Sequence, residues 1–229
     1  MADITFYFPT TGTAAHTDIA PAAIWDDIDE LTRLPLNTTR GASGGATVNI
    51  YKSSNLHYAC DRQYVSAALA ARDWITADTF DVSFSWRDQA SVGATFYLSI
   101  RVANADGSIA GTLYQGVINA TNIYASWQTR HNDGVAVQNN VSMPTDGHIV
   151  IEVGLYSAAN GGATVSYLTG ENLSNAAPLN DTDVSGDVWP WLAFTYGAGP
   201  SPIGPSGAIA SAEDVDGAAM MRGTIQSEV

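Results

Sequence analysis

Hydrophobic and polar residues alternate over short stretches along most of the chain, with turn residues between the stretches. Such a period of two is typical of β-strands, and no long stretch repeats at the spacing of a helix. The pattern predicts ten strands, at residues 4–8, 46–51, 56–60, 78–86, 94–103, 109–114, 121–127, 148–156, 162–168 and 191–196. Ten short strands separated by turns predict an all-β fold, most simply an antiparallel β-sandwich.

Asp-Gly and Asn-Gly pairs mark the expected turns. Residues 105–107 (ADG) follow an apolar strand, and residues 132–134, 146–147 and 160–162 have a similar composition. Glycine accepts a positive φ, and aspartate bonds to its own backbone in a tight turn. We therefore expect hairpins or sheet crossings at these four places.

The strand 148–156 is the most regular of the ten. Its odd-numbered residues are isoleucine, valine and leucine and are expected to face the core, while His148, Val150, Glu152 and Gly154 share the other face. This pattern predicts a half-buried strand. Glu152 is the best strand carboxylate for glycosidase chemistry, which needs two carboxyl groups about 5–10 Å apart, but a single strand glutamate usually faces solvent.

Helical spacing is confined to residues 21–31 (PAAIWDDIDEL). Either one short amphipathic turn or a loop with one buried tryptophan, Trp25, fits this segment. Its acidic residues, Asp26, Asp27, Asp29 and Glu30, are expected to form a solvated face rather than an ion site. Residues 32–47 are rich in glycine, threonine and serine and are expected to form a loop that crosses the surface.

Three segments follow from this reading. Residues 1–50 form an N-terminal strand and an extended crossing segment, residues 51–196 form the β-sandwich domain, and residues 197–229 form a Pro/Gly-rich arm. The prolines of the arm prevent regular strand pairing. Its apolar residues are candidates for docking on a neighbouring subunit, although a disordered tail has a similar composition; they are Ile203, Ile209, Val215, Met220, Met221 and Ile225.

Composition and charge exclude several classes of partner. The chain has 229 residues, of which 45% are hydrophobic, and nine Lys and Arg against 23 Asp and Glu give a net charge of -14. Phosphate backbones repel such a chain, and it has no basic patch for an anionic membrane. We expect neither a signal peptide nor a transmembrane segment. One cysteine, Cys60, permits no intrachain disulfide, so stability is expected from packing or from association.

The sequence carries no strong catalytic motif. A G-x-S-x-G elbow, an H-E-x-x-H helix, a phosphate loop and a dinucleotide fingerprint are all missing. His57 and Cys60 are close in sequence but would point to opposite faces of a strand over 56–60, which separates the thiol from the imidazole. We therefore expect no enzymatic activity and no cofactor.

Two binding hypotheses remain open. Asp181, Asp183 and Asp187 match the opening of a calcium loop, but the twelfth position of an EF-hand would be Leu192 instead of glutamate. Two interpretations of this segment remain, a simpler calcium loop and an acidic turn. Tryptophan rings, with Trp86 and Trp127 as the candidates, could stack on sugars.

Several stretches resemble the β-sandwich virion proteins of tailed bacteriophages, a group of head-decoration and tail structural proteins. The stretches are FYFPTTGTA (6–14), RLPLNTTRG (33–41), RQYVSAALAA (62–71), TFDVSFSW (79–86), FYLSIRVANADGSIAGTLYQG (96–116), GHIVIEVGLYS (147–157) and WPWLAFTY (189–196). The acidic balance and the long Pro-rich arm depart from the pattern of the group.

The resemblance implies a jelly-roll-like sandwich that assembles in symmetric copies without catalysis. It predicts a capsid decoration or cement protein that binds the major capsid protein or other virion subunits and itself, as a homotrimer or another cyclic oligomer. Such a protein is made in the host cytoplasm and lies on the outer surface of a head or tail. The alternative is a carbohydrate-binding module of a tail fibre that recognises the host surface.

Overall fold

The fold is described from a computed structural model. The structure describes residues 4–28, 31–39, 41, 45–53, 55–88, 93–118, 128–158, 161–170 and 190–195. Every regular element within these ranges is a β-strand, which confirms the predicted all-β class. Within the same ranges we find no apolar helix of membrane-spanning length.

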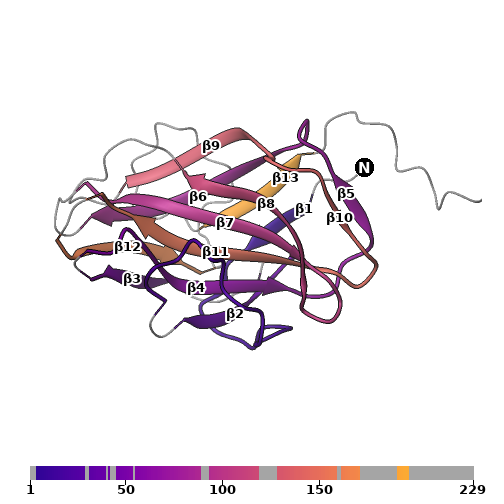
Figure 1. Cartoon of the computed structure of the whole chain (residues 1–229), viewed down its shortest axis with the longest axis horizontal. Helices are drawn as coiled ribbons and strands as arrows, with labels where there is room; N and C mark the ends of the chain where they lie inside the picture. Colours follow the sequence, from indigo (N-terminus) through magenta and orange to yellow (C-terminus); the bar gives the residue numbers. More distant parts are fainter. Residues whose placement is uncertain are drawn as a thin grey trace, which may run out of the picture. The chain divides into compact units, whose positions relative to one another are not determined.

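Two sheets contain most of the strands (Figure 1). The first sheet consists of β1 (Ile4–Tyr7), β3 (Ala46–Lys52), β6 (Thr79–Asp88), β9 (Gln128–Ala136), β12 (Ala163–Thr169) and β13 (Trp191–Thr195). The second sheet consists of β2 (Thr32–Leu36), β4 (Tyr58–Ser66), β7 (Thr95–Ala103), β8 (Ile109–Val117) and β11 (His148–Tyr156). Two short strands, β5 (Arg72–Trp74) and β10 (Val141–Met143), pair with each other.

The connectivity is that of a jelly roll. Neighbouring strands run β3-β12-β6-β9 in the first sheet and β4-β11-β7-β8 in the second. From β3 to β12 the chain changes sheet at each step between these eight strands, except at the β7-β8 hairpin. This order forms the two Greek keys of a jelly roll and confirms the predicted jelly-roll-like sandwich. β13 extends the first sheet by pairing with the first half of β6, and β1 pairs with β13.

Aromatic side chains fill the space between the sheets. The rings of Trp86 and Phe96 stack with their centroids 5.0 Å apart, and Phe84 lies 4.6 Å from Phe96. Eight Phe and Trp side chains of the main core are at most 2% exposed, namely Phe6, Phe8, Trp74, Phe80, Phe84, Trp86, Phe96 and Phe194. Burial of each such ring contributes about 1.5–3 kcal/mol relative to exposure, so the inner faces of the sandwich form its main stabilising contact.

The chain between β1 and β2 crosses the outer face of the second sheet, and we call residues 9–28 the strap. Ala14 and Ile19 of the strap pack against Val65, Val150 and Ala103 of the sheet. As a result, β11 is buried on both faces, and the prediction of a half-buried strand over 148–156 is wrong.

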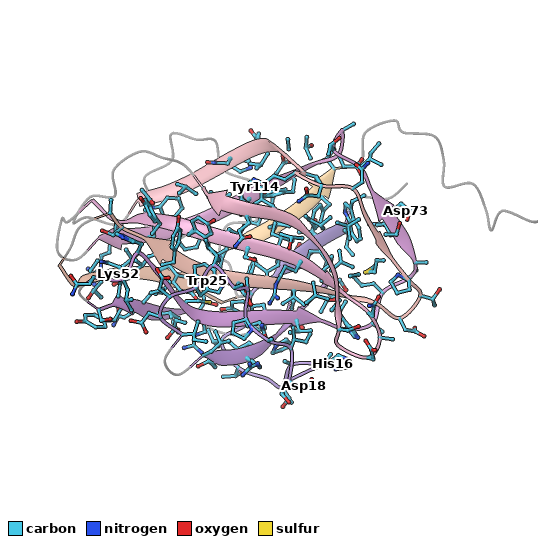
Figure 2. All side chains as sticks on the ribbon, viewed as in Figure 1. His16, Asp18, Trp25, Lys52, Asp73 and Tyr114 are labelled. Atoms are coloured by element: carbon cyan, nitrogen blue, oxygen red, sulfur yellow. The ribbon has the colours of Figure 1, made fainter. Side chains whose placement is uncertain are left out.

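The C-terminal half of the strap is a loop rather than a helical turn. Trp25 is only 7% exposed and packs against Cys60 and Tyr97, so the second of the two sequence interpretations is confirmed. In Figure 2 Trp25 lies toward the middle of the sheet face, and His16 and Asp18 lie at its lower edge.

Two local predictions fail for reasons of strand pairing. Residues 32–36 form strand β2, parallel to β4, instead of a loop; Pro35 is tolerated there because β2 is an edge strand. Residues 132–134 lie inside β9 instead of in a turn. Gly134 has a φ of 62° beside a register shift opposite Phe80 and Val82, which is the geometry of a β-bulge.

The other turn predictions have different outcomes. Gly107 has a φ of 84° and Asp106 accepts a bond from the backbone N–H of Ser108, which confirms the turn at 105–107. Asp146 has a φ of 63°, in the turn predicted at 146–147. The predicted strand 121–127 and part of the predicted turn 160–162 lie outside the described residues.

Candidate functional site: the strap and its buried carboxylate

The most polar cluster on the second sheet is centred on Glu152, at the middle of β11. Its side chain is fully buried beneath the strap. The carboxylate accepts the backbone N–H of Ala22 at 3.1 Å to each oxygen and the indole N–H of Trp25 at 2.8 Å. Gln63 donates to Oε1 from 3.0 Å, and Arg101 forms a buried ion pair with the same oxygen. The carboxylate therefore has donors from both the sheet and the strap.

Side chains of the sheet also bind the carbonyl groups of the strap. Arg101 Nη2 donates to the carbonyl of Ala20 at 2.7 Å, and Gln63 Nε2 and Arg33 Nη2 each lie 3.3 Å from the carbonyl of Ile19. Buried backbone groups that lack a partner cost about 1–3 kcal/mol each. These three contacts give the irregular backbone of the strap the partners that a neighbouring strand would otherwise supply.

Residue 154 is a glycine, and because it has no side chain there is room for Trp25. A Cβ atom at Gly154 would overlap the six-membered ring of Trp25 and the carbonyl oxygen of Ala59. Only glycine therefore lets the indole approach the sheet closely enough for its N–H to reach Glu152.

This cluster holds the strap on the second sheet. Glu152 is closed off from solvent, and its charge is balanced by Arg101 at 2.5 Å. A glycosidase carboxyl has to reach both substrate and water. The expectation that Glu152 faces solvent is wrong, because the strap that covers it lies about 130 positions earlier in the sequence.

The end of the strap is fixed along the edge of β4. The backbone N–H groups of Asp26 and Asp27 both donate to the carbonyl of Tyr58 at 3.0 Å, and the N–H of Cys60 donates to the carbonyl of Asp27. The carboxylate of Asp27 accepts two bonds from Ser53 at 3.2 Å. Two of the four acidic residues of the predicted solvated face thus hold backbone groups, while Asp29 and Glu30 lie outside the described residues.

A series of five aromatic rings, each in contact with the next, leads from the buried carboxylate of Glu152 to the surface. Trp25 contacts Tyr97 at 5.4 Å between ring centroids, Tyr97 contacts Tyr58 at 5.1 Å, Tyr58 contacts Tyr156 at 4.9 Å, and Tyr156 contacts His57 at 6.5 Å. Burial, together with Tyr58 and Tyr114, raises the pKa of Tyr97 to about 12. Burial, with Tyr156 and Asp26 beside it, also raises the pKa of Tyr58. Both phenols are therefore protonated near neutral pH.

His57 and Cys60 do not form a nucleophile pair. Cys60 is buried, and its thiol lies 3.5 Å from the carbonyl oxygens of Arg62 and Val153. Burial, reinforced by Glu152, raises the pKa of the thiol well above its ordinary value. The imidazole of His57 is exposed and lies 3.2 Å from the carbonyl of Ser157. A protonated, enclosed thiol cannot act as a nucleophile.

The other predicted site residues are either buried or lie outside the described residues. Trp86 is 2% exposed and stacked on Phe96, so it offers no surface for a sugar. Trp127 lies outside the described residues, as do the calcium-loop residues Asp181, Asp183 and Asp187. The docking residues of the arm also lie outside them, namely Ile203, Ile209, Val215, Met220, Met221 and Ile225.

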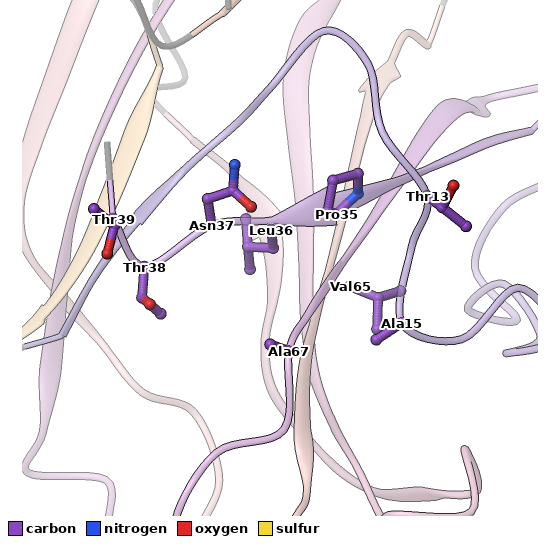
Figure 3. A pocket seen from close by; sticks show the side chains of 9 residues that line it. All are labelled: Thr13, Ala15, Pro35, Leu36, Asn37, Thr38, Thr39, Val65 and Ala67. Atoms are coloured by element: carbon purple, nitrogen blue, oxygen red, sulfur yellow. The ribbon is translucent and has the colours of Figure 1, made fainter. Parts of the chain in front are cut away.

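Chemistry-bearing groups are sparse elsewhere in the described part of the chain. There, no three His, Cys, Asp or Glu side chains are grouped so as to hold a metal ion. A shallow pocket of about 310 Å³ lies between the start of the strap and β2 (Figure 3). Its lining has no titratable side chain and consists of Thr13, Ala15, Pro35, Leu36, Asn37, Thr38, Thr39, Val65 and Ala67.

No protein-family model and no curated protein matches the chain. Solved structures with similar folds include the pre-peptidase C-terminal domain of a collagenase from Bacillus anthracis, at 13% identity over 61% of this chain and 95% of that chain (TM-score 0.21). A CocE/NonD family hydrolase from Staphylococcus aureus has 11% identity over 71% of this chain and 32% of that chain (TM-score 0.27). The VP2 subviral particle of infectious bursal disease virus has 12% identity over 69% and 38% (TM-score 0.21).

The chain thus spans most of the collagenase domain but well under half of the hydrolase and of the viral protein. At these identities and TM-scores the likeness transfers no function. A jelly roll is used by capsid proteins, lectins and cupins alike, so the function has to be argued from the residues of this chain.

Proposed function

We propose that this protein is a non-enzymatic structural subunit of a virion, and specifically a decoration protein on the head of a tailed phage. The observation that carries the proposal is the closed jelly roll. Its interior is filled by aromatic rings, and the buried charges of Glu152 and Arg101 hold its own strap. Such a body is suited to making contacts, since neither its interior nor its central carboxylate is open to a substrate.

The charge of the chain supports the same role. With 23 Asp and Glu against nine Lys and Arg, the chain is repelled by nucleic acid. A subunit on the outer surface of a particle gains from this repulsion, because it does not adhere to the packaged or released genome. Many weak contacts between copies then sum to a stable association through multivalency.

The proposed partners are the major capsid protein or another virion subunit, and further copies of the chain in a trimer or another closed ring. In this proposal the apolar residues of the arm, residues 197–229, dock on a neighbouring subunit. The arm adds contact area to each copy at a small cost in chain length. Its prolines limit the conformations that have to be ordered on docking.

Light scattering on the full-length chain tests the arm hypothesis. Changing Ile203→Ser, Ile209→Ser and Ile225→Ser together keeps the length and charge of the arm but removes much of its apolar surface. We expect a discrete oligomer for the unmodified chain and monomers for the triple variant. The change Ile109→Ser, at a side chain 38% exposed on the sandwich, is the matched control and should leave the oligomer intact. Oligomers that survive in the triple variant would contradict docking through the arm.

A carbohydrate-binding module is the second candidate function. Trp86 no longer supports it, since that ring is buried. The observation in its favour is the row of rings that emerges from beneath the strap at His57, Tyr58 and Tyr156.

A further inference from the structure

The outer face of the second sheet has one aromatic region beyond the strap. Tyr58 at the start of β4 and Tyr156 at the end of β11 are directly opposite each other in the strand register. Both side chains are half-buried, and the neighbouring His57 is exposed. We call these three residues, together with Asp26, the aromatic surface.

The rings of this surface are tilted against one another and are supported by rings beneath them. The planes of Tyr58 and Tyr156 differ by 38°, and those of Tyr156 and His57 by 39°. Tyr97, which is 8% exposed, meets the ring of Tyr58 edge-on. Trp25 in turn braces Tyr97. The rings are therefore held in place before any ligand arrives, which lowers the entropy cost of binding.

Polar groups border these rings. The carboxylate of Asp26 is fixed beside them, because its Oδ2 accepts the backbone N–H groups of His57 at 3.0 Å and Tyr58 at 3.2 Å. His57 Nδ1 lies 3.2 Å from the carbonyl oxygen of Ser157, which can only accept, so Nδ1 is the donor there and Nε2 is the ring nitrogen left for a ligand. The surface thus combines apolar ring faces with a carboxylate, an imidazole nitrogen and phenol hydroxyls.

We propose that the aromatic surface binds a neutral carbohydrate. The C–H face of a pyranose is flat and apolar and packs on an aromatic ring, and its hydroxyl groups form hydrogen bonds with carboxylates and imidazole nitrogens. A uronic or sialic acid would meet Asp26 and a chain of net charge -14, so charge favours an uncharged sugar. The proposal rests on the second candidate function, for which it names the site and the class of sugar, and it does not depend on the structural role.

Calorimetric titration of the full chain tests this assignment. The probes are neutral hexasaccharides of glucose, galactose and N-acetylglucosamine, with a hexasaccharide of galacturonic acid as the charged counterpart. We expect at least one neutral probe to bind in the micromolar to millimolar range, and the acidic probe to bind at least tenfold more weakly. Tyr156→Ala should lower the affinity at least tenfold, whereas Tyr156→Phe keeps the stacking ring and most of the affinity.

Two further variants keep the test clear of folding defects. His57→Ala removes an exposed ring that no strand packing needs, and it should weaken binding without lowering the melting temperature. Tyr51→Ala removes a tyrosine that is 62% exposed on strand β3 of the other sheet, and it should leave binding unchanged. The proposal is overturned if no neutral probe binds, if the acidic probe binds best, or if Tyr51→Ala weakens binding as much as His57→Ala. None of these results changes the oligomer test of the structural role.

Discussion

Glu152 shows how a single buried charge can fix the path of a long irregular segment. Burial of an ion pair costs desolvation energy that its Coulomb attraction often only offsets. Here the carboxylate also accepts bonds from Ala22, Trp25 and Gln63. An apolar residue at 152 would bury as well, but it would not specify where Ala22 and Trp25 have to lie. The charge therefore contributes to specificity of the strap's position more than to net stability.

Removing this charge should be strongly destabilising. In Glu152→Gln the guanidinium of Arg101 stays buried without its counter-charge, and such a loss typically costs about 3–5 kcal/mol. Urea denaturation measures the change in the free energy of unfolding. Asp18→Asn, at a side chain that is 78% exposed, is the control and should change it by less than about 0.5 kcal/mol. A Glu152→Gln variant as stable as the control would show that the cluster is not structural.

The buried thiol of Cys60 should make the free energy of unfolding fall as the pH becomes alkaline. Its pKa is raised in the folded chain by burial, so the unfolded chain loses the thiol proton first as pH rises above about 8.5. The free energy of unfolding should then fall by up to about 1.4 kcal/mol per pH unit. Urea denaturation at pH 8 and pH 9.5 measures the slope. Cys60→Ala should show a smaller slope, and equal slopes in the two proteins would disprove the assignment.

At the scale of elements, the strap covers the outer face of the second sheet, which would otherwise be exposed to solvent. It crosses from β1 in the first sheet to β2 in the second and covers the face on which β4, β7 and β11 lie side by side. Because the strap covers this face, the surface of this sheet that remains for binding a partner consists of the strand edges, the loops and the aromatic surface.

Gly154→Ala should loosen the strap without touching its polar contacts directly. The added methyl group would overlap Trp25 and the backbone of β4, and overpacking of this kind costs about 1–3 kcal/mol. Hydrogen exchange should show faster exchange at the amide of Ala22 and through the second half of the strap. Gly161→Ala adds a methyl group with no atom within 4 Å and should leave exchange unchanged. Unaltered exchange in Gly154→Ala would mean that Trp25 does not depend on the gap at 154.

The sequence predicts elements well where one physical signal dominates. β7 and β11 agree with their predicted ranges to within one residue, because both alternate without interruption. β2 escapes prediction since a proline argues against a strand, although an edge strand accepts one. Gly134 belongs to a bulge and not to a turn, and the residues alone do not separate the two. The role of Glu152 depends on a contact about 130 positions away, and no local pattern encodes such a contact.

On the scale of the whole molecule, a filled interior, a fastened strap and a strongly acidic composition are compatible with the proposed structural role. Among the described residues the two sheets enclose a core of buried hydrophobic side chains, and the one cysteine of the chain is free and buried. The proposed decoration role joins these properties, because a decoration protein has to be rigid, repelled by nucleic acid and able to bind many identical neighbours.

Immunogold electron microscopy of purified virus particles is the most direct test of this role. Particles from the source of the sequence would be banded in a density gradient and labelled with antibodies raised against the full chain. The proposal predicts regular label on the outside of the heads, and mass spectrometry of the same band should detect the chain in many copies per particle. Unlabelled particles, with the chain found only in the soluble fraction, would contradict it.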